Sequence, residues 1–407
     1  LRHALSIEGT TSFAEECRAL SDRVTRAKHE SVPSALLESL PSYEEPWLST
    51  APYSKPMPRV KAPYLFPKVP QKCTAPEPGI TLLDMLEPRC AANLTSCTAK
   101  MFADMSKINT HPGETRWRPK ACAYSPTCLL PRYRGCVWDL RDPTRVVPLD
   151  YAREQPTHLN LDFYRVEMEG HPDQELLSHM IHGVRFLADL EHQFVIMPHL
   201  LSLGKAFPSV QKELRRLRGL KWVEFYCSPP FWPMRASPQG CTPRKYEDRW
   251  RRTSDASAPH TPLFDCASQP IFSLNTASQR PRVVDGIEYP IPKEHKPTLR
   301  QAMRNLAILL HVASLTGEQV FLFTDDVADY FNQLRLAAEE EWKSVVVTLS
   351  TPGDATYDVS RGPELRYVNE RVLGFGTTRS SNYAQRHTNL LKTPGARNCH
   401  LVNGRAF

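Results

Sequence analysis

The sequence lacks long apolar runs and paired cysteine motifs. No stretch approaches the roughly 18 consecutive apolar residues of a membrane span, and the first residues show no signal-peptide pattern of charged, apolar and small-residue zones. Eleven cysteines are scattered, and Cys90, Cys97, Cys122, Cys128 and Cys136 lack the two-residue spacing with a following histidine that a zinc finger or knuckle requires. We therefore expect a soluble intracellular protein of the cytoplasm or nucleus, with reduced thiols and no membrane partner.

Hydrolase chemistry has little support either, because no serine, cysteine and histidine constellation is apparent. His179 and His182 share one helical face, but a three-residue histidine pair on an amphipathic helix is more often surface or core histidine than a metal site. The net charge of +7 favours polyanionic partners without approaching the charge density of a dedicated nucleic-acid-binding arm.

Proline is abundant, with 37 residues in the chain, and it is dense between Pro52 and Pro78. Proline lacks a backbone donor and fixes φ, which disfavours long helices and central strands. Residues 1–165 are therefore expected to be a proline-rich, poorly ordered or extended region, with short helices only at 12–27 and 34–40. No internal repeat is apparent.

A packed domain is predicted to begin near Asp173, a candidate N-cap before a helix that ends at Gly183. Apolar spacing after Thr298 predicts a core helix that ends at Gly317. The other predicted elements are a helix at 209–218, a strand at 221–226 followed by a loop through 229–233, a strand at 320–323, a short helix at 337–342, and a hairpin of strands 344–349 and 365–373. This order of helices and strands indicates an α+β fold.

The apolar run at 320–323 ends in Thr324-Asp325-Asp326. A carboxylate held at a strand end suits phosphoryl transfer by two metal ions. Neighbouring strand residues face opposite sides, so only one of the two aspartates can face such a site. Taken alone, an acidic pair at a strand end is more often a solvated cap.

Two further segments carry the same chemistry. Residues 240–259 predict a basic hairpin suited to a triphosphate, or alternatively a solvated hairpin. Residues 373–386 predict a glycine-bearing turn entering a polar helix, suited to close approach of a nucleotide, or alternatively an ordinary strand-to-helix connection. The hairpin's basic residues are Arg244 and Lys245 on one arm and Arg249, Arg251 and Arg252 on the other.

In this order, the three segments resemble the fingers, motif A and motif B of the reverse transcriptase domain of retroelements, over about residues 220–386. The resemblance implies an α+β right-hand polymerase, with fingers at 166–315, a partial palm at 316–386 and an unmatched tail at 387–407. The implied function is that of a retrotransposon RNA-directed DNA polymerase. Its partners are a primed RNA or DNA template and deoxynucleoside triphosphates, its cofactors are two Mg²⁺ ions, and no protein partner is evident.

The resemblance also assigns roles to single residues. Trp250, Arg251 and Asp255 fill the fingers pattern, in which the arginine and an upstream basic residue, Lys245 or Arg244, bind the triphosphate. The motif B pattern departs from the family at Gly374, where proline is usual, and at Ala384, where phenylalanine is usual. The implied roles are Asp326 as catalytic residue and metal ligand, the Val327 carbonyl as metal ligand, Phe331 as the screen of the ribose, Phe375 and Gly376 as nucleotide contacts, and Gln385 and Arg244 as template or primer contacts.

The family's next element is a hairpin with two further adjacent aspartates, and residues 387–407 contain no aspartate or glutamate. We therefore expect a fragment that stops before the active site is complete and is inactive by itself. The alternatives are a non-catalytic nucleic-acid-binding remnant and the product of a retroelement pseudogene.

Overall fold

The chain divides into two compact units, Leu1–Lys55 with Pro292–Ala328, and Pro56–Ile291 with Asp329–Phe407. All helices and strands that carry a label below belong to the second unit. The computed structural model describes residues 77, 79–110, 121–134, 137–141, 146–147, 157, 159–169, 174–186, 188, 190, 192–244, 250–278, 282–284, 287–289, 303, 306–307, 310–311, 313–315, 317, 319, 329–354, 357–374, 376–378, 380–384 and 386–387.

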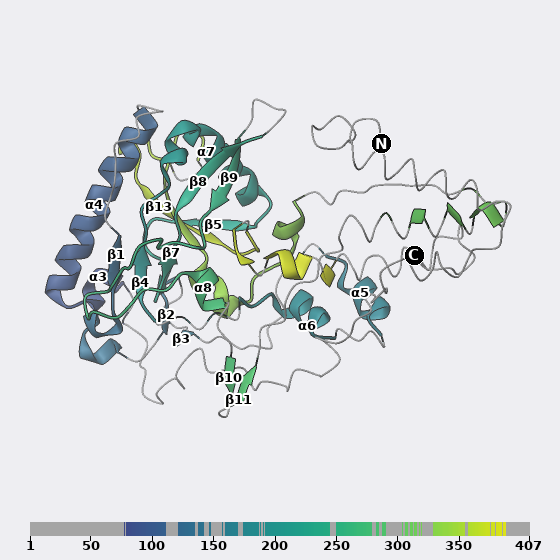
Figure 1. Cartoon of the computed structure of the whole chain (residues 1–407). Helices are drawn as coiled ribbons and strands as arrows, with labels where there is room; N and C mark the ends of the chain where they lie inside the picture. The colour runs from purple at the N-terminus through teal and green to yellow at the C-terminus, as the bar shows by residue number, and fades with distance from the viewer. Residues whose placement is uncertain are drawn as a thin grey trace. The chain divides into compact units, whose positions relative to one another are not determined.

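The second unit is α+β and is built on a six-stranded mixed sheet (Figure 1). The β4–β7 and β7–β12 pairs are parallel, and the other pairs are antiparallel. Every residue of β12 is buried, which explains its nearly continuous apolar sequence. The strand order is β1 (Cys122–Tyr124), β4 (Phe194–Ile196), β7 (Arg235–Ala236), β12 (Val345–Leu349), β13 (Leu365–Glu370) and β5 (Val223–Tyr226).

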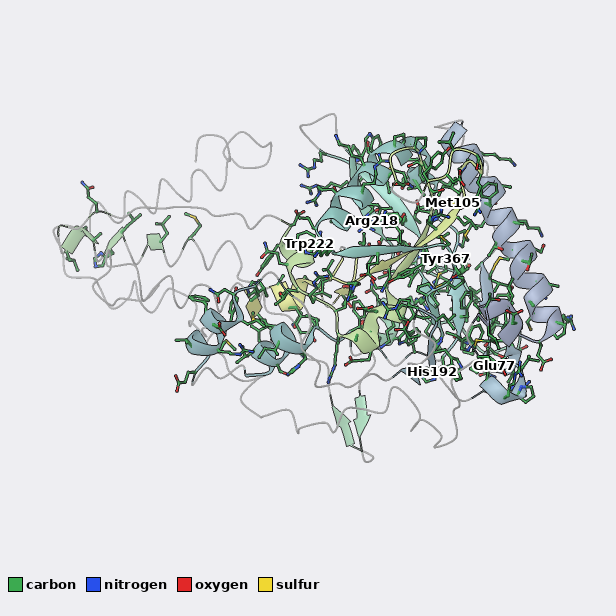
Figure 2. All side chains as sticks on the ribbon, turned by 180° about the vertical axis from the view of Figure 1, so that it is seen from behind. Glu77, Met105, His192, Arg218, Trp222 and Tyr367 are labelled. Carbon is green, nitrogen blue, oxygen red and sulfur yellow. A yellow bond between two sulfur atoms is a disulfide. The ribbon has the colours of Figure 1, made fainter. Side chains whose placement is uncertain are left out.

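Two helices, α4 (Pro88–Thr110) and α7 (Phe207–Gly219), contact each other and the sheet. Their apolar residues recur at helical spacing and lie in one buried cluster with the sheet. Figure 2 labels three residues of this core: Met105 of α4, Trp222 just before β5 (Val223–Tyr226), and Tyr367 of β13. The buried apolar face of each helix therefore fixes its place on the sheet.

The smaller elements complete the second unit. A three-stranded sheet has the order β3-β2-β6, and two hairpins pair β8 with β9 and β10 with β11. The remaining bounds are α3 (Leu82–Met85), β2 (Val137–Asp139), β3 (Val146–Val147), α5 (Leu161–Glu167), α6 (Gln174–His182), β6 (Phe231–Trp232), β8 (Gln239–Pro243), β9 (Trp250–Ser254), α8 (Leu274–Ser278), β10 (Arg282–Val284) and β11 (Ile287–Tyr289), with 3₁₀ turns η3 (Pro126–Cys128), η4 (Pro131–Tyr133), η5 (Leu201–Lys205), η6 (Tyr330–Gln333) and η7 (Ala338–Lys343).

The expectation that residues 1–165 hold no long helix is wrong. Helix α4 has 23 residues, and β1 is an edge strand of the main sheet. No proline occurs between Arg89 and Thr110, and Pro88 stands at the first helical position, where its missing donor costs nothing. The proline density of residues 52–78 therefore gave no information about the structure of residues 88–110. Residues 1–76 and the predicted helices at 12–27 and 34–40 lie outside the described residues.

Reduced thiols were expected throughout, and this is wrong for one pair. Cys97 of α4 and Cys122 of β1 form a disulfide, with their Cα atoms 6.6 Å apart. The bond joins the helix to the edge of the main sheet, which reinforces the apolar packing between them.

The other local predictions largely hold. Helix α6 ends before Gly183, as predicted, and α7 covers the predicted helix at 209–218. The strand pair β12 and β13 forms the predicted hairpin, although β13 ends at Glu370. The segment at 337–342 is a 3₁₀ turn rather than an α-helix, and the predicted loop at 229–233 contains β6.

The predicted core helix after Thr298 falls in the first unit. Met303, Leu306 and Leu310 are helical, but none is buried, and Leu310 is 39% exposed. The described part of this helix is therefore not a core helix. The predicted strand at 320–323 lies outside the described residues.

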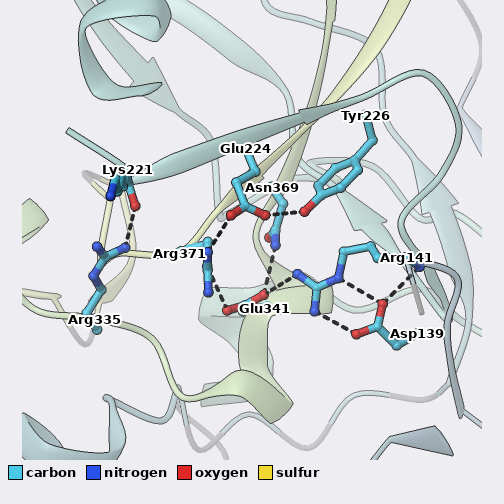
Figure 3. Close-up of polar contacts among 9 residues, drawn as sticks. All are labelled: Asp139, Arg141, Lys221, Glu224, Tyr226, Arg335, Glu341, Asn369 and Arg371. Carbon is cyan, nitrogen blue, oxygen red and sulfur yellow. Dashed lines mark hydrogen bonds and ion pairs between the residues drawn. The ribbon is translucent and has the colours of Figure 1, made fainter. Parts of the chain in front are cut away.

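A buried carboxylate organises the polar contacts of the second unit (Figure 3). Glu341 of η7, 2% exposed, accepts hydrogen bonds from Arg141 Nη1 at 2.8 Å and Asn369 Nδ2 at 2.9 Å. Arg371 Nε donates to the same carboxylate at 3.3 Å. Two guanidinium groups and one amide thus donate to a single buried carboxylate, which compensates for its loss of water.

The network extends from Glu341 in two directions. Arg141 also forms a bidentate pair with Asp139 of β2, at 2.8 and 2.7 Å. Arg371 reaches Glu224 of β5, which accepts a second bond from the Tyr226 hydroxyl. Burial alone would raise the pKa of Glu224, but these two donors hold the pKa below its ordinary value. The three-stranded sheet and the six-stranded sheet are therefore joined through η7.

We expect Glu341→Gln to lower the free energy of unfolding by about 1.5–3 kcal/mol, because Arg141 and Arg371 each keep one carboxylate partner, Asp139 or Glu224, but lose their hydrogen bonds to a charged one. Urea unfolding followed by circular dichroism measures this. The matched control is Glu213→Gln, which breaks a surface pair with Arg216 and should cost about 0–1 kcal/mol. Equal losses in the two variants would show that the network is not a stabilising unit.

Candidate nucleotide-binding site at the basic hairpin

The predicted basic hairpin is present. Strands β8 and β9 pair antiparallel, with Thr242 opposite Arg251 and Cys241 opposite Arg252. Arg244 follows β8 and is exposed. Residues 245–249 lie outside the described residues, so nothing is stated of Lys245 or Arg249.

The base of the hairpin is fixed to η5 and to the chain before it. The Gln239 backbone N–H donates to His199 Nδ1 at 2.9 Å, and the Cys241 N–H donates to Ser202 Oγ at 3.1 Å. Burial lowers the pKa of His199 to about 4, so the imidazole is neutral and its Nδ1 accepts this bond. A Cβ at position 240 would lie 2.7 Å from Ser202 Oγ, so Gly240 permits the close approach.

Neighbouring arginines of β9 face opposite sides, as strand geometry requires. Arg252 pairs with Glu370 of β13 and ties the hairpin to the main sheet. Arg251 is exposed, and the described residues offer it no ion pair. The strand therefore presents an exposed guanidinium that pairs with no described acid, and a guanidinium suits a phosphate or carboxylate ligand.

The glycine turn of the predicted motif B packs against the end of β9. Gly376 has φ +105°, and a Cβ built there would lie 2.1 Å from the Ser254 carbonyl oxygen. Asn275 of α8 joins the two, because its Nδ2 donates to Gly376 O and its Oδ1 accepts from Thr378 N, both at 2.8 Å. The hairpin and the turn therefore belong to one local structure. Sequence reasoning did not find Asn275, which lies 101 residues from Gly376 and carries no motif.

Asp329, which precedes η6, is held by α7. Arg216 forms a bidentate pair with Asp329, at 2.7 and 2.9 Å, and α7 also contacts β9. Phe331 in η6 is half-buried against the main core, and its ring stacks near that of Tyr330. Five predicted site residues lie outside the described residues: Lys245, Asp326, Val327, Phe375 and Gln385.

The arginines of α7 contact neighbouring groups of the second unit. Arg215 Nη1 donates to Thr351 Oγ1 at 3.1 Å, and the Arg218 guanidinium lies 5.3 Å from the centre of the Phe225 ring. Arg216 is bound to Asp329, so all three arginines make contacts within the fold. Arg251 is therefore the better candidate to bind an anionic ligand.

His179 is a core residue. Its ring meets that of Tyr383 edge-on at 5.0 Å, and burial places the pKa of His179 well below its ordinary value. His387 is also buried and hydrogen-bonds the Tyr164 hydroxyl at 2.7 Å. His179 and His387 are therefore packing residues of the second unit.

No protein-family model matches the chain, and a search of curated proteins found no match. Among the described residues, no helix combines the length and apolar character needed to cross a membrane.

We expect Gly376→Ala to destabilise the second unit by more than about 4 kcal/mol, the range of a severe core clash, because the added methyl meets a backbone oxygen that cannot rotate away. Gly362→Ala is the matched control, since Gly362 also has positive φ but no atom within 4 Å of the added Cβ. The control should cost about 1–2 kcal/mol, the strain of the left-handed backbone alone. Urea unfolding of both variants gives the difference, and similar losses would contradict the close packing.

Proposed function

We propose that this chain is the fingers and palm part of a retroelement RNA-directed DNA polymerase, a reverse transcriptase. The observation that carries the proposal is the packing of Gly376 against Ser254. Two segments that resemble the fingers and motif B of this family are far apart in the sequence, yet they meet through backbone contact. An ordinary solvated hairpin and an ordinary connection have no reason to meet in this way.

In the proposed site, Arg251 binds the phosphates of an incoming deoxynucleoside triphosphate. Three features support this role: the guanidinium is exposed, its strand is anchored by the Arg252–Glu370 pair, and no described acid neutralises it. Lys245 is the second proposed phosphate contact, and Phe331 screens the ribose. The primed RNA or DNA template lies along Gln385 and Arg244.

Asp326 and the Val327 carbonyl are the proposed ligands of two Mg²⁺ ions, which supply the Lewis acidity for nucleotidyl transfer in this class of enzyme. This part of the proposal rests on the sequence resemblance alone.

The second candidate function is non-catalytic binding of nucleic acid by a retroelement remnant. The same hairpin favours it, since an exposed arginine can contact nucleic-acid phosphates without any metal chemistry. Affinity for a primed template that falls as salt rises, without nucleotide incorporation, indicates the remnant. A pseudogene product with no selected function binds no template even at low salt.

We expect Arg251→Ala to weaken binding of a deoxynucleoside triphosphate in the presence of primed RNA about 10–100-fold, because a hydrogen-bonded charge contributes about 1.5–3 kcal/mol. Fluorescence anisotropy with a labelled nucleotide measures this. Arg251→Lys keeps the charge but loses the planar fork, so its affinity should be intermediate. Arg361→Ala, at an exposed position in the loop between β12 and β13, is the control. Unchanged binding by Arg251→Ala would remove Arg251 from the site.

The 407-residue chain by itself should extend a primed RNA template negligibly, because the resemblance finds in it one of the three carboxylates that the family uses. A primer-extension assay with Asp326→Ala as the comparison measures this. Extension that disappears in Asp326→Ala would refute the expected inactivity while supporting the assigned role of Asp326. Sequencing the transcript beyond the codon for Phe407 then asks whether an adjacent aspartate pair follows.

A further inference from the structure

Three cysteines that are distant in the sequence converge in the second unit. The Sγ atoms of Cys90, Cys128 and Cys266 all lie within 4.8 Å of one another. The closest pair is Cys128 and Cys266, whose Sγ atoms are 2.7 Å apart. Cys128 is buried, Cys90 is half-buried and Cys266 is exposed, so the cluster has one side open to solvent.

Backbone contacts hold the three thiols in place. The Glu87 N–H, just before α4, donates to the Cys128 carbonyl at 2.8 Å, which joins the helix carrying Cys90 to the turn carrying Cys128. The loop of Cys266 is shaped by Asp265, whose Oδ1 accepts from the N–H groups of Ala267 and Gln269 at 2.8 and 2.9 Å. The Ser125 N–H points at Cys266 Sγ from 3.4 Å. The cluster is therefore assembled by three separately fixed segments.

We propose that Cys90, Cys128 and Cys266 form a zinc site with three thiolate ligands and a fourth coordination position open to solvent. Thiolates select soft cations such as zinc. Tetrahedral Zn–S bonds of about 2.3 Å place neighbouring sulfurs about 3.8 Å apart. The three sulfurs lie within 4.8 Å of one another, and the Cys128–Cys266 pair, at 2.7 Å, would open by about 1 Å on binding the ion. Among the described residues, no fourth cysteine, histidine or carboxylate atom joins the group. The exposed side of Cys266 leaves the fourth position to water or another small ligand.

A zinc ion deprotonates the thiols that coordinate it, so three thiols that converge in this way can serve as thiolate ligands. Cys90 also lies in the first turn of α4, where the helix dipole stabilises negative charge.

The zinc site does not depend on the proposed polymerase function. It would join the start of α4, the η3 turn and the loop that carries Cys266, beyond the end of β9. If the folded chain binds zinc but no nucleotide, the zinc site stands and the polymerase function fails. If it binds nucleotide but no zinc, the polymerase function stands and the zinc site fails.

The test is titration of the untagged full chain, purified under reducing conditions, with Co²⁺ as a spectroscopic probe. We expect thiolate-to-cobalt charge-transfer absorption in the near ultraviolet that saturates at one equivalent and is abolished by Zn²⁺. Cys266→Ser should weaken cobalt binding by more than the ~10–100-fold that loss of an outer-shell partner costs. Cys266 is exposed, so this variant should fold, and circular dichroism checks that it does.

Cys227→Ser is the matched control, because Cys227 is an exposed free cysteine outside the cluster. It should bind cobalt like the unchanged chain. The proposal is wrong if the unchanged chain gives no charge-transfer band, or if Cys266→Ser and Cys227→Ser give the same band as the unchanged chain. Peptide mapping that finds a Cys128–Cys266 disulfide, in a chain that binds no cobalt after reduction, would identify the cluster as a redox pair instead.

Discussion

The fold of the second unit depends on how one buried carboxylate is neutralised. Glu341 stands between the two sheets, and its charge requires donors from both of them: Arg141 beyond β2, and Asn369 and Arg371 at the end of β13. Apolar packing alone is non-directional and would tolerate a sliding of one sheet past the other. Hydrogen bonds to a buried charge are directional, so they fix the relative position of the two sheets.

The same strand that serves this carboxylate also positions the hairpin. Successive side chains of β13 point to opposite faces. Asn369 turns toward Glu341, Glu370 turns toward Arg252 of the hairpin, and Arg371 turns back to Glu341. The register of a few residues thus couples the polar interior to the surface where Arg251 is exposed. A one-residue slip of β13 would exchange the two faces and break both sets of contacts.

Local sequence patterns predicted the helices and hairpins that neighbouring residues determine. The hairpin of β8 and β9, the helices α6 and α7 and the pair β12 and β13 followed from turn residues and periodicity. Helix α4 was missed because the proline density of its neighbours was extended to a segment without proline. Asn275 and the convergence of Cys90, Cys128 and Cys266 could not be predicted, since their partners lie far along the chain and share no spacing rule. The proposed catalytic residue Asp326 lies outside the described residues, so its assignment still rests on the sequence.

The contact between Gly376 and Ser254 restricts the residue type at position 376 but not at position 254. The group that excludes a side chain at 376 is a backbone oxygen, which every residue type carries. No change at position 254 can make room for a larger residue at 376, so no compensating pair of substitutions exists. Among related sequences, glycine should therefore persist at 376 while 254 drifts, and the contact would leave no trace of covariation even though the two positions touch.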